Sequence, residues 1–147
     1  MKLSRYEYTA DGHAELFMFT SVGPKGAIKK LVVYSQMLQN DIYNLGFGDY
    51  NEDNGTIDDI VITDNNDSQK ILATVASTLY VFTDKHPDVW VYATGSNTAR
   101  TRLYRMGITT NLEEIIVDFE VYGLQNETWH EFKKGEDYQA FLVKRKF

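Results

Sequence analysis

The hydrophobic pattern of this sequence changes period near its middle, and the change limits the folds that the chain can adopt. Up to about residue 64, aromatic and β-branched residues form short runs between turn residues, which predicts strands. From Ser68 to Lys85 the apolar residues recur instead at steps of four, four and three. They are Ile71, Val75, Leu79 and Phe82. This spacing, followed by Pro87, predicts one helix over residues 68–85 and an α+β protein.

Turn residues divide the first part of the chain into two predicted hairpins. The expected strands cover residues 14–22, 27–35, 41–50 and 56–64. Pro24 and Gly26 favour a tight turn between the first two strands. Asn54 and Gly55 form the dipeptide that best accommodates a type I′ turn between the next two.

The second half predicts a strand at 88–95, a helix at 97–106 that Gly107 ends, and a short helix at 111–118. Three closing strands are expected at 119–124, 128–132 and 138–147. The strand–helix–strand unit from Ile57 to Ala93 is expected to join parallel neighbours, because such crossovers almost always do. We therefore expect one domain over residues 1–147, with a mixed, mainly antiparallel sheet around a central strand–helix–strand–helix unit.

The long predicted helix is unusual in its lack of charge. Between Lys70 and Asp84 it carries no charged residue, so the face opposite the apolar stripe is uncharged as well. That face consists of Thr74, Ser77, Thr78 and Val81. A solvent-facing helix normally carries more Lys and Glu, so we expect this helix to be covered on more than one side. The cover is either the rest of the domain or a second copy of the chain.

Composition and charge exclude several classes of protein. The chain has no cysteine, which removes disulfides, thiolate nucleophiles and cysteine-based zinc sites. Its net charge of −6 repels a polyanion, so no nucleic-acid partner is expected. No run approaches the ~20 apolar residues that span a bilayer, and the first residues lack a signal-peptide pattern. These features predict a cytoplasmic protein with no membrane partner.

No metal site is expected either. The three histidines are isolated, and none has a partner at metal-ligand spacing. They are His13, His86 and His130. The stretch DYNEDNG is similar to a calcium loop, but Ile60 stands where the bidentate Glu is required.

Three of the five arginines, Arg100, Arg102 and Arg105, lie within six residues, behind a Gly-Ser-Asn-Thr turn. The predicted crossover brings this turn and the turn at residues 64–69 to one edge of the sheet, and each turn opens a helix. Free N–H groups at helix starts attract phosphate or carboxylate. The sequence therefore predicts a site for a small anionic ligand. Alternatively, the arginines pair with nearby carboxylates such as Glu113, Glu114 or Asp118.

Helix geometry divides these arginines between two faces. Arg102 and Arg105 are three residues apart and share a face, whereas Arg100 points about 200° away from Arg102 at ~100° per residue. At most two of them can hold one ligand from the helix, and Arg102 and Arg105 are the pair that we assign to it.

The run NTARTRLYRMGI resembles the closing motif of the GCN5-related N-acyltransferases. The matching residues are Asn97, Ala99, Leu103, Tyr104, Gly107 and Ile108. The resemblance implies that fold's core from its second strand onward, a general-acid role for Tyr104, and coenzyme A or acetyl-coenzyme A as the cofactor. In that family the turn before the preceding helix cradles the pyrophosphate. The corresponding stretch here, DNNDSQKILA, lacks the family's glycines.

The whole chain also resembles an uncharacterised family of small bacterial proteins that shares the blocks FGDY, DSQK, YATGS and RTRLYRMG, and this resemblance implies no activity. For the ligand site we assign Tyr104 as the catalytic candidate. The binding candidates are Asn66, Ser68, Gln69, Ser96, Asn97, Arg102 and Arg105. Whether the chain is an enzyme stays open. The alternative is a non-catalytic interaction or regulatory module that acts as a homodimer through the helix at 68–85 or through an exposed strand edge.

Overall fold

One nine-stranded sheet and three helices make up the part of the chain that the structure, a computed structural model, describes: residues 4–39, 41–58, 63–95 and 97–147. The strands are β1 (Thr9–Ala10), β2 (Leu16–Gly23), β3 (Gly26–Gln36), β4 (Ile42–Asn51), β5 (Thr56–Ile57), β6 (Trp90–Ala93), β7 (Phe119–Gln125), β8 (Thr128–Glu131) and β9 (Ala140–Arg145). The helices are α1 (Ser68–Lys85), α2 (Thr98–Thr110) and α3 (Leu112–Asp118).

The sheet has the order β1-β2-β3-β4-β6-β9-β7-β8, and β5 pairs with β4 outside this path. Every described pair of strands is antiparallel except β4 and β6. The expected α+β class with a mixed, mainly antiparallel sheet is therefore confirmed.

The predicted parallel neighbour of β6 was wrong. We expected the strand that contains Ile57, but β5 pairs with β4 in antiparallel register, Tyr50 opposite Ile57. The Asn54-Gly55 turn reverses the chain, with Gly55 at φ +71°, so β5 cannot run in the same direction as β4 and β6. The crossover therefore starts from β4. Residues 59–62 of the predicted strand lie outside the described residues.

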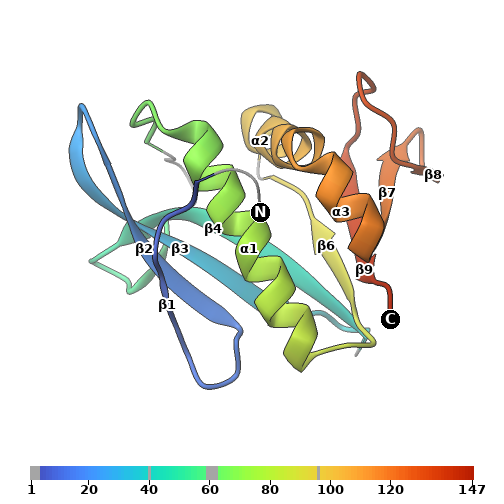
Figure 1. The fold of residues 1–147 in the computed structure, drawn as a ribbon, viewed down its shortest axis with the longest axis horizontal. Coiled ribbons are helices and arrows are strands. Elements are labelled where there is room, and N and C mark those ends of the chain that lie inside the picture. The colour runs from blue at the N-terminus through green and yellow to red at the C-terminus, as the bar shows by residue number, and fades with distance from the viewer. Residues whose placement is uncertain (1–3, 40, 59–62, 96) are drawn as a thin grey trace.

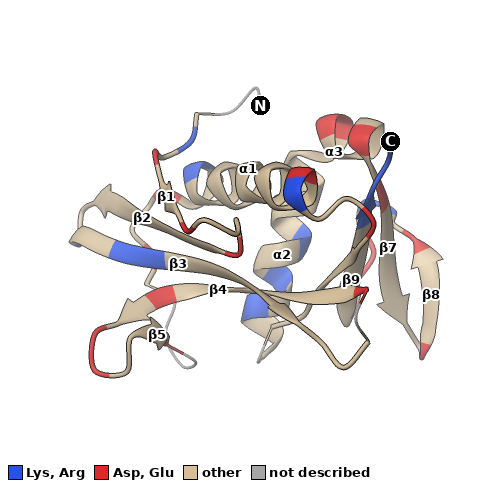
Figure 2. Cartoon of the chain, turned by 90° about the horizontal axis from the view of Figure 1, so that it is seen from below, with Lys and Arg blue, Asp and Glu red and all other residues tan. Residues whose placement is uncertain are grey.

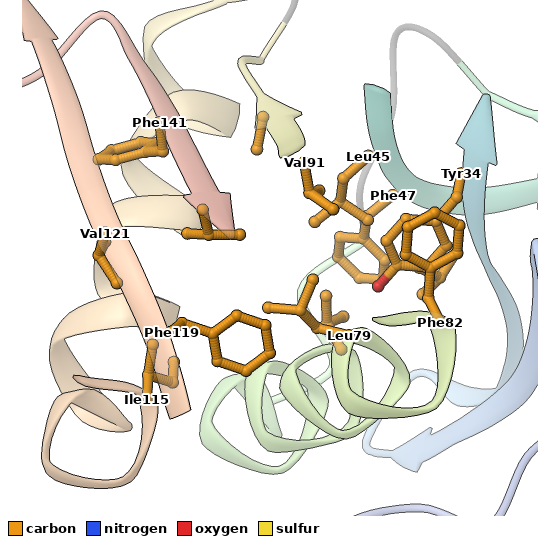
Figure 3. Packing of buried hydrophobic residues seen from close by; sticks show 14 of the residues in the cluster. Tyr34, Leu45, Phe47, Leu79, Phe82, Val91, Ile115, Phe119, Val121 and Phe141 are labelled. Atoms are coloured by element: carbon orange, nitrogen blue, oxygen red, sulfur yellow. The ribbon is translucent and has the colours of Figure 1, made fainter. Parts of the chain in front are cut away.

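The helices gather on one side of the sheet (Figures 1 and 2). α1 and α3 lie over this face, and the first turn of α2 lies near the level of the sheet. The hydrophobic core fills the space between them, as Figure 3 shows for side chains from α1, α3 and the strands. Its tightest aromatic contact joins Tyr34 of β3 to Phe82 of α1, whose ring centroids are 4.2 Å apart in a stacked geometry.

α1 has the bounds that its apolar spacing predicts, and the chain itself covers its uncharged face. The Tyr6 N–H donates to Thr74 Oγ1 at 2.9 Å, and the hydroxyls of Tyr34 and Thr78 are 2.9 Å apart. Thr74 and Thr78 are fully buried. The rest of the domain, the first of the two expected covers, therefore buries Thr74 and Thr78, whereas Ser77 and Val81 stay partly exposed.

α2 does not end at Gly107 as predicted but continues to Thr110. Gly107 faces α1, where a Cβ would lie 3.2 Å from Leu72 Cδ2. The glycine therefore serves the contact between two helices and does not terminate α2. The following Asn111 donates from Nδ2 to the Gly107 carbonyl at 2.8 Å, and α3 begins at the next residue.

No helix within the described residues combines the length and apolar character needed to cross a membrane.

Candidate functional site

The parallel pairing of β4 and β6 is short. It joins Ile42–Asn44 to Trp90–Tyr92, after which β6 ends at Ala93 and the chain turns into α2. β4 continues to Asn51. Since β3 occupies one edge of β4, β6 and β5 must both use the other edge. Among the described strands, none pairs with that edge along residues 45–48.

Two side chains of α2 lie against this unpaired stretch of β4. The Tyr104 hydroxyl donates to the Leu45 carbonyl at 3.3 Å. Arg100 Nη2 donates to the Asp58 carbonyl at 2.6 Å. Because Arg100 and Tyr104 are four residues apart on a helix, they share one face, and this face of α2 enters the gap between β4 and β6.

A crevice of about 370 Å³ opens at this gap. Its polar walls include Ser35, Asn44, Thr94 and Arg100, and Leu45 and Tyr104 supply apolar surface. Arg100 is only 9% exposed. Within the described residues its guanidinium hydrogen-bonds to a main-chain carbonyl and forms no ion pair with a carboxylate. Arg100 thus places a buried positive charge at the crevice, which favours an anionic or strongly polar group there.

Burial raises the pKa of the Tyr104 hydroxyl to about 12. The Arg100 charge and a hydrogen bond from the Phe47 backbone act in the opposite direction, because both favour the phenolate. Tyr104 is therefore protonated at neutral pH and can donate a hydrogen bond into the gap.

The start of α1, where an anionic ligand was predicted to bind, carries a carboxylate that is held by the chain's own polar groups. Asp67 Oδ2 accepts hydrogen bonds from the Tyr6 hydroxyl at 2.5 Å and from Ser21 Oγ at 2.6 Å. The buried Asn65 amide donates to Ser21 Oγ and to the Gly26 carbonyl. A carboxylate already lies at this helix start, so it disfavours a second anion there.

The structure separates the predicted binding residues into different surroundings. Asn66, Ser68 and Gln69 are exposed at the start of α1. The groove beside them is lined from α2 by Leu103 and Met106, not by arginines. The predicted joint site of the α1 start with Arg102 and Arg105 is therefore not assembled.

Arg102 and Arg105 line a different hollow, beside the loop that precedes β9. Arg105 forms an ion pair there with Asp137, so its partner is a carboxylate other than Glu113, Glu114 and Asp118. The side chain of Asn97 caps α2, since its Oδ1 accepts from the Arg100 N–H at 2.9 Å. Ser96 lies outside the described residues.

Sequence reasoning missed Arg100 as a candidate binding residue. It assigned the ligand to Arg102 and Arg105 because these two share a helical face. The resemblance had already identified Tyr104 as a candidate. Arg100 lies four residues before Tyr104 and so shares its helical face, and this spacing could have identified Arg100. Tyr104 itself lies at the gap.

The fold and the crevice thus define an α+β protein whose sheet contains one short parallel pair with a candidate ligand site where the pair ends. The chain belongs to a family of unknown function (DUF6934), whose model matches residues 2–146. No curated protein and no solved structure matches it significantly. Among the described residues, no group of three or more His, Asp or Glu side chains could hold a metal ion.

Proposed function

We propose that this protein is an N-acyltransferase-like domain that binds an acyl thioester in the crevice between β4 and β6. One observation carries the proposal: the parallel pairing stops after three residue pairs, and Arg100 and Tyr104 lie at the gap that follows. The sheet order, with one parallel pair among antiparallel strands and a helix between its two members, is consistent with the fold that the sequence motif resembles.

The edge of β4 along residues 45–48, with which no described strand pairs, suits an extended ligand that contains amide groups. Main-chain groups along residues 45–48 can hydrogen-bond to such a ligand in the way that one strand pairs with another. The ligand would displace the 3.3 Å hydrogen bond of Tyr104 to Leu45, which is long for an O–H donor. The Tyr104 hydroxyl then becomes free to donate to the bound molecule.

Arg100 and Tyr104 have different roles in this proposal. When an amine attacks the thioester carbonyl, negative charge develops on the carbonyl oxygen, and the buried Arg100 guanidinium stabilises it. The nitrogen–carbon bond forms, the carbon–sulfur bond breaks, and the proton lost by the amine balances the one gained by the thiol. Because the pKa of Tyr104 is about 12, above the ~8.5 of a thiol, Tyr104 stabilises the departing thiolate mainly as a hydrogen-bond donor.

The carboxylate at the start of α1 indicates which part of the ligand this site holds. Asp67 places a carboxylate at the start of α1, and in the resembling family the turn before the corresponding helix holds the coenzyme's pyrophosphate. The thioester arm is therefore the recognised part, and the phosphates contribute little to the affinity. This predicts similar binding of acetyl-coenzyme A and of S-acetyl-N-acetylcysteamine, a thioester that has no phosphate.

Thermal unfolding and titration calorimetry with these two thioesters test the proposal. A ligand at a hundred times its dissociation constant adds about 2.7 kcal/mol to the free energy of unfolding, which raises the midpoint by roughly 5–11 °C for a chain of this size. Arg100→Gln is expected to weaken binding at least tenfold. Tyr104→Phe is expected to preserve binding and slow the release of thiol in the presence of an amine.

Arg102→Gln is the matched control, since Arg102 lies on the same helix but is exposed and does not line the crevice. Circular dichroism of the Arg100 variant establishes that it is folded. The proposal fails if neither thioester shifts the midpoint, or if the Arg102 variant loses as much affinity as the Arg100 variant.

A second candidate function is self-association through the sheet face opposite the helices. On this face Trp90 lies 5.9 Å from Tyr122, and Tyr92 lies 6.3 Å from Trp129, between ring centroids. Trp129 is 39% exposed. Glu120 and Lys144 are cross-strand neighbours beside these rings, so a two-fold axis can bring the Lys of one copy to the Glu of the other.

Light scattering after size exclusion tests this candidate. Trp129→Glu is expected to convert a dimer to a monomer, while Val117→Glu, at an exposed site on α3, leaves the dimer intact. A wild-type protein that is monomeric at high concentration removes the candidate.

A further inference from the structure

A second cavity lies on the helix side of the gap, directly behind Tyr104. It has a volume of about 60 Å³, and it is lined by residues of α1, α2, α3 and the strands β4, β6 and β9. Its walls are apolar apart from the Tyr104 side chain, and they include Ala76, Leu79, Ala93, Ile108 and Phe141. Figure 3 shows Leu79 of α1 and Phe141 of β9 among the side chains of this core. An apolar space of this kind stays dry and accepts an apolar group.

The two cavities share two walls, Leu45 and Tyr104. The polar crevice, with the buried Arg100, lies on one side of these residues, and the apolar cavity lies on the other. The hydrogen bond between the Tyr104 hydroxyl and the Leu45 carbonyl joins these two shared residues. A ligand that displaces this bond therefore reaches polar and apolar surroundings at once.

We infer that the apolar cavity holds the acyl chain of the ligand and restricts it to a short one. This inference rests on the proposed function, because it requires a thioester in the crevice. A carbonyl group at Arg100 and Tyr104 directs the attached chain towards the apolar side of Tyr104. An engineered apolar cavity of about 150 Å³ accepts benzene, so a cavity of about 60 Å³ accepts an apolar group of roughly two or three carbon atoms. The ligand class is therefore a propionyl-like or butyryl-like acyl thioester.

Packing explains why longer chains do not fit. Leu79, Val91 and Phe141 form the far side of the cavity and are at most 7% exposed. They belong to the main hydrophobic cluster, which is packed too densely to open at small cost. A chain that exceeds the cavity must displace these side chains, and inserting extra methylenes into a packed core is destabilising.

A series of S-acyl-N-acetylcysteamine thioesters tests the inference: acetyl, propionyl, butyryl, hexanoyl and octanoyl. Each methylene that enters the cavity is expected to strengthen binding by up to about fourfold, the equivalent of the transfer free energy of one buried CH₂. Affinity is expected to reach its maximum at propionyl or butyryl and to fall at least tenfold by octanoyl.

Two substitutions are expected to move this maximum in opposite directions. Ala76→Val fills part of the cavity, so the preferred chain becomes shorter. Ile108→Ala enlarges the cavity from a partly exposed position on α2, so the preferred chain becomes longer. Leu103→Ala is the matched control, because Leu103 is also partly exposed on α2 but lines the groove beside α1 instead of this cavity.

The outcomes separate the inference from the proposed function. Arg100-dependent binding of all thioesters with no dependence on chain length, or with octanoyl as the tightest ligand, overturns the short-chain inference and leaves the proposed function standing. An unchanged maximum in both cavity variants overturns it as well. Failure of every thioester to bind overturns the inference and the proposed function together.

Discussion

Gly95 and Arg100 approach each other so closely that a Cβ on Gly95 would lie 2.3 Å from the Arg100 Cβ. The same Cβ would lie 2.4 Å from the Thr101 backbone N. This contact packs the turn after β6 against the first turn of α2, and it places the Arg100 side chain in the gap beside β4. The absence of a side chain at Gly95 is thus a condition for the geometry of the crevice.

Gly95→Ala is therefore expected to displace the start of α2. The clash involves backbone, so it cannot be relieved by rotating a side chain, and a cost of about 1–3 kcal/mol is typical of such overpacking. Urea unfolding measures this cost, and thioester titration is expected to show weaker binding because Arg100 moves. Gly12→Ala is the control, since nothing lies within 4 Å of a Cβ at Gly12. A Gly95 variant as stable as the Gly12 variant would contradict this account.

The ion pair of Lys30 and Asp49 is expected to be essential for stability. Lys30 Nζ lies 2.5 Å from Asp49 Oδ1 and 2.8 Å from the Thr63 carbonyl, and Lys30 is fully buried. Asp49→Asn leaves the buried ammonium without a counter-charge, which typically costs about 3–5 kcal/mol. The free energy of unfolding in urea at neutral pH measures the loss.

Lys29→Met provides the comparison for this pair. Lys29 is the exposed neighbour of Lys30 on β3, so its replacement should change the stability by no more than about 0.5 kcal/mol. Equal losses in the two variants would show that burial of Lys30 has no special cost.

The raised pKa of Tyr104 predicts a loss of stability at high pH. The folded value is about 12, and the ordinary value is 10.0. Because the folded state holds the proton more tightly than the unfolded state, the contribution is fully present below pH 10 and is lost as the pH rises towards 12. A shift of two pKa units corresponds to about 2.7 kcal/mol.

Tyr104→Phe isolates this contribution. Between pH 10 and pH 12 the variant is expected to lose less stability than the wild type, by up to about 2.7 kcal/mol, because it has no hydroxyl to ionise at this position. Below pH 9 the two proteins should differ by a constant amount of about 0.5–1.5 kcal/mol, for the lost hydrogen bond to Leu45. Parallel stability curves across the alkaline range would contradict the assignment.

Elements with a strong local signal could be predicted from the sequence. α1 runs from Ser68 to Lys85 as its apolar period requires, and the Asn54-Gly55 turn forms the expected hairpin. Asn97 caps α2 in the manner that its position before the helix suggests. In each case the signal lies in residues within a few positions of one another, so local geometry is enough to predict the element from the sequence pattern.

The candidate site could be predicted only in part. Tyr104 lies at the gap, and the separation of Arg100 from Arg102 and Arg105 follows from helix geometry alone. That Arg100 is the buried member could not be deduced, because its burial depends on where α2 meets β4, some fifty residues earlier in the chain. The hydrogen bonds from Tyr6 and Ser21 to Asp67, at the start of α1, also join segments far apart in sequence.

The sequence by itself determined the class of fold, the order of the elements from β2 onward, and the bounds of α1, because hydrophobic period and turn chemistry act over short distances. Only the tertiary structure decided that β4 is the parallel partner of β6, that Gly107 faces Leu72 within an unbroken helix, and that Arg100 lies buried in the gap. These features arise from packing between segments distant in the chain. The residues next to a position in the sequence do not determine which distant segment that position will pack against.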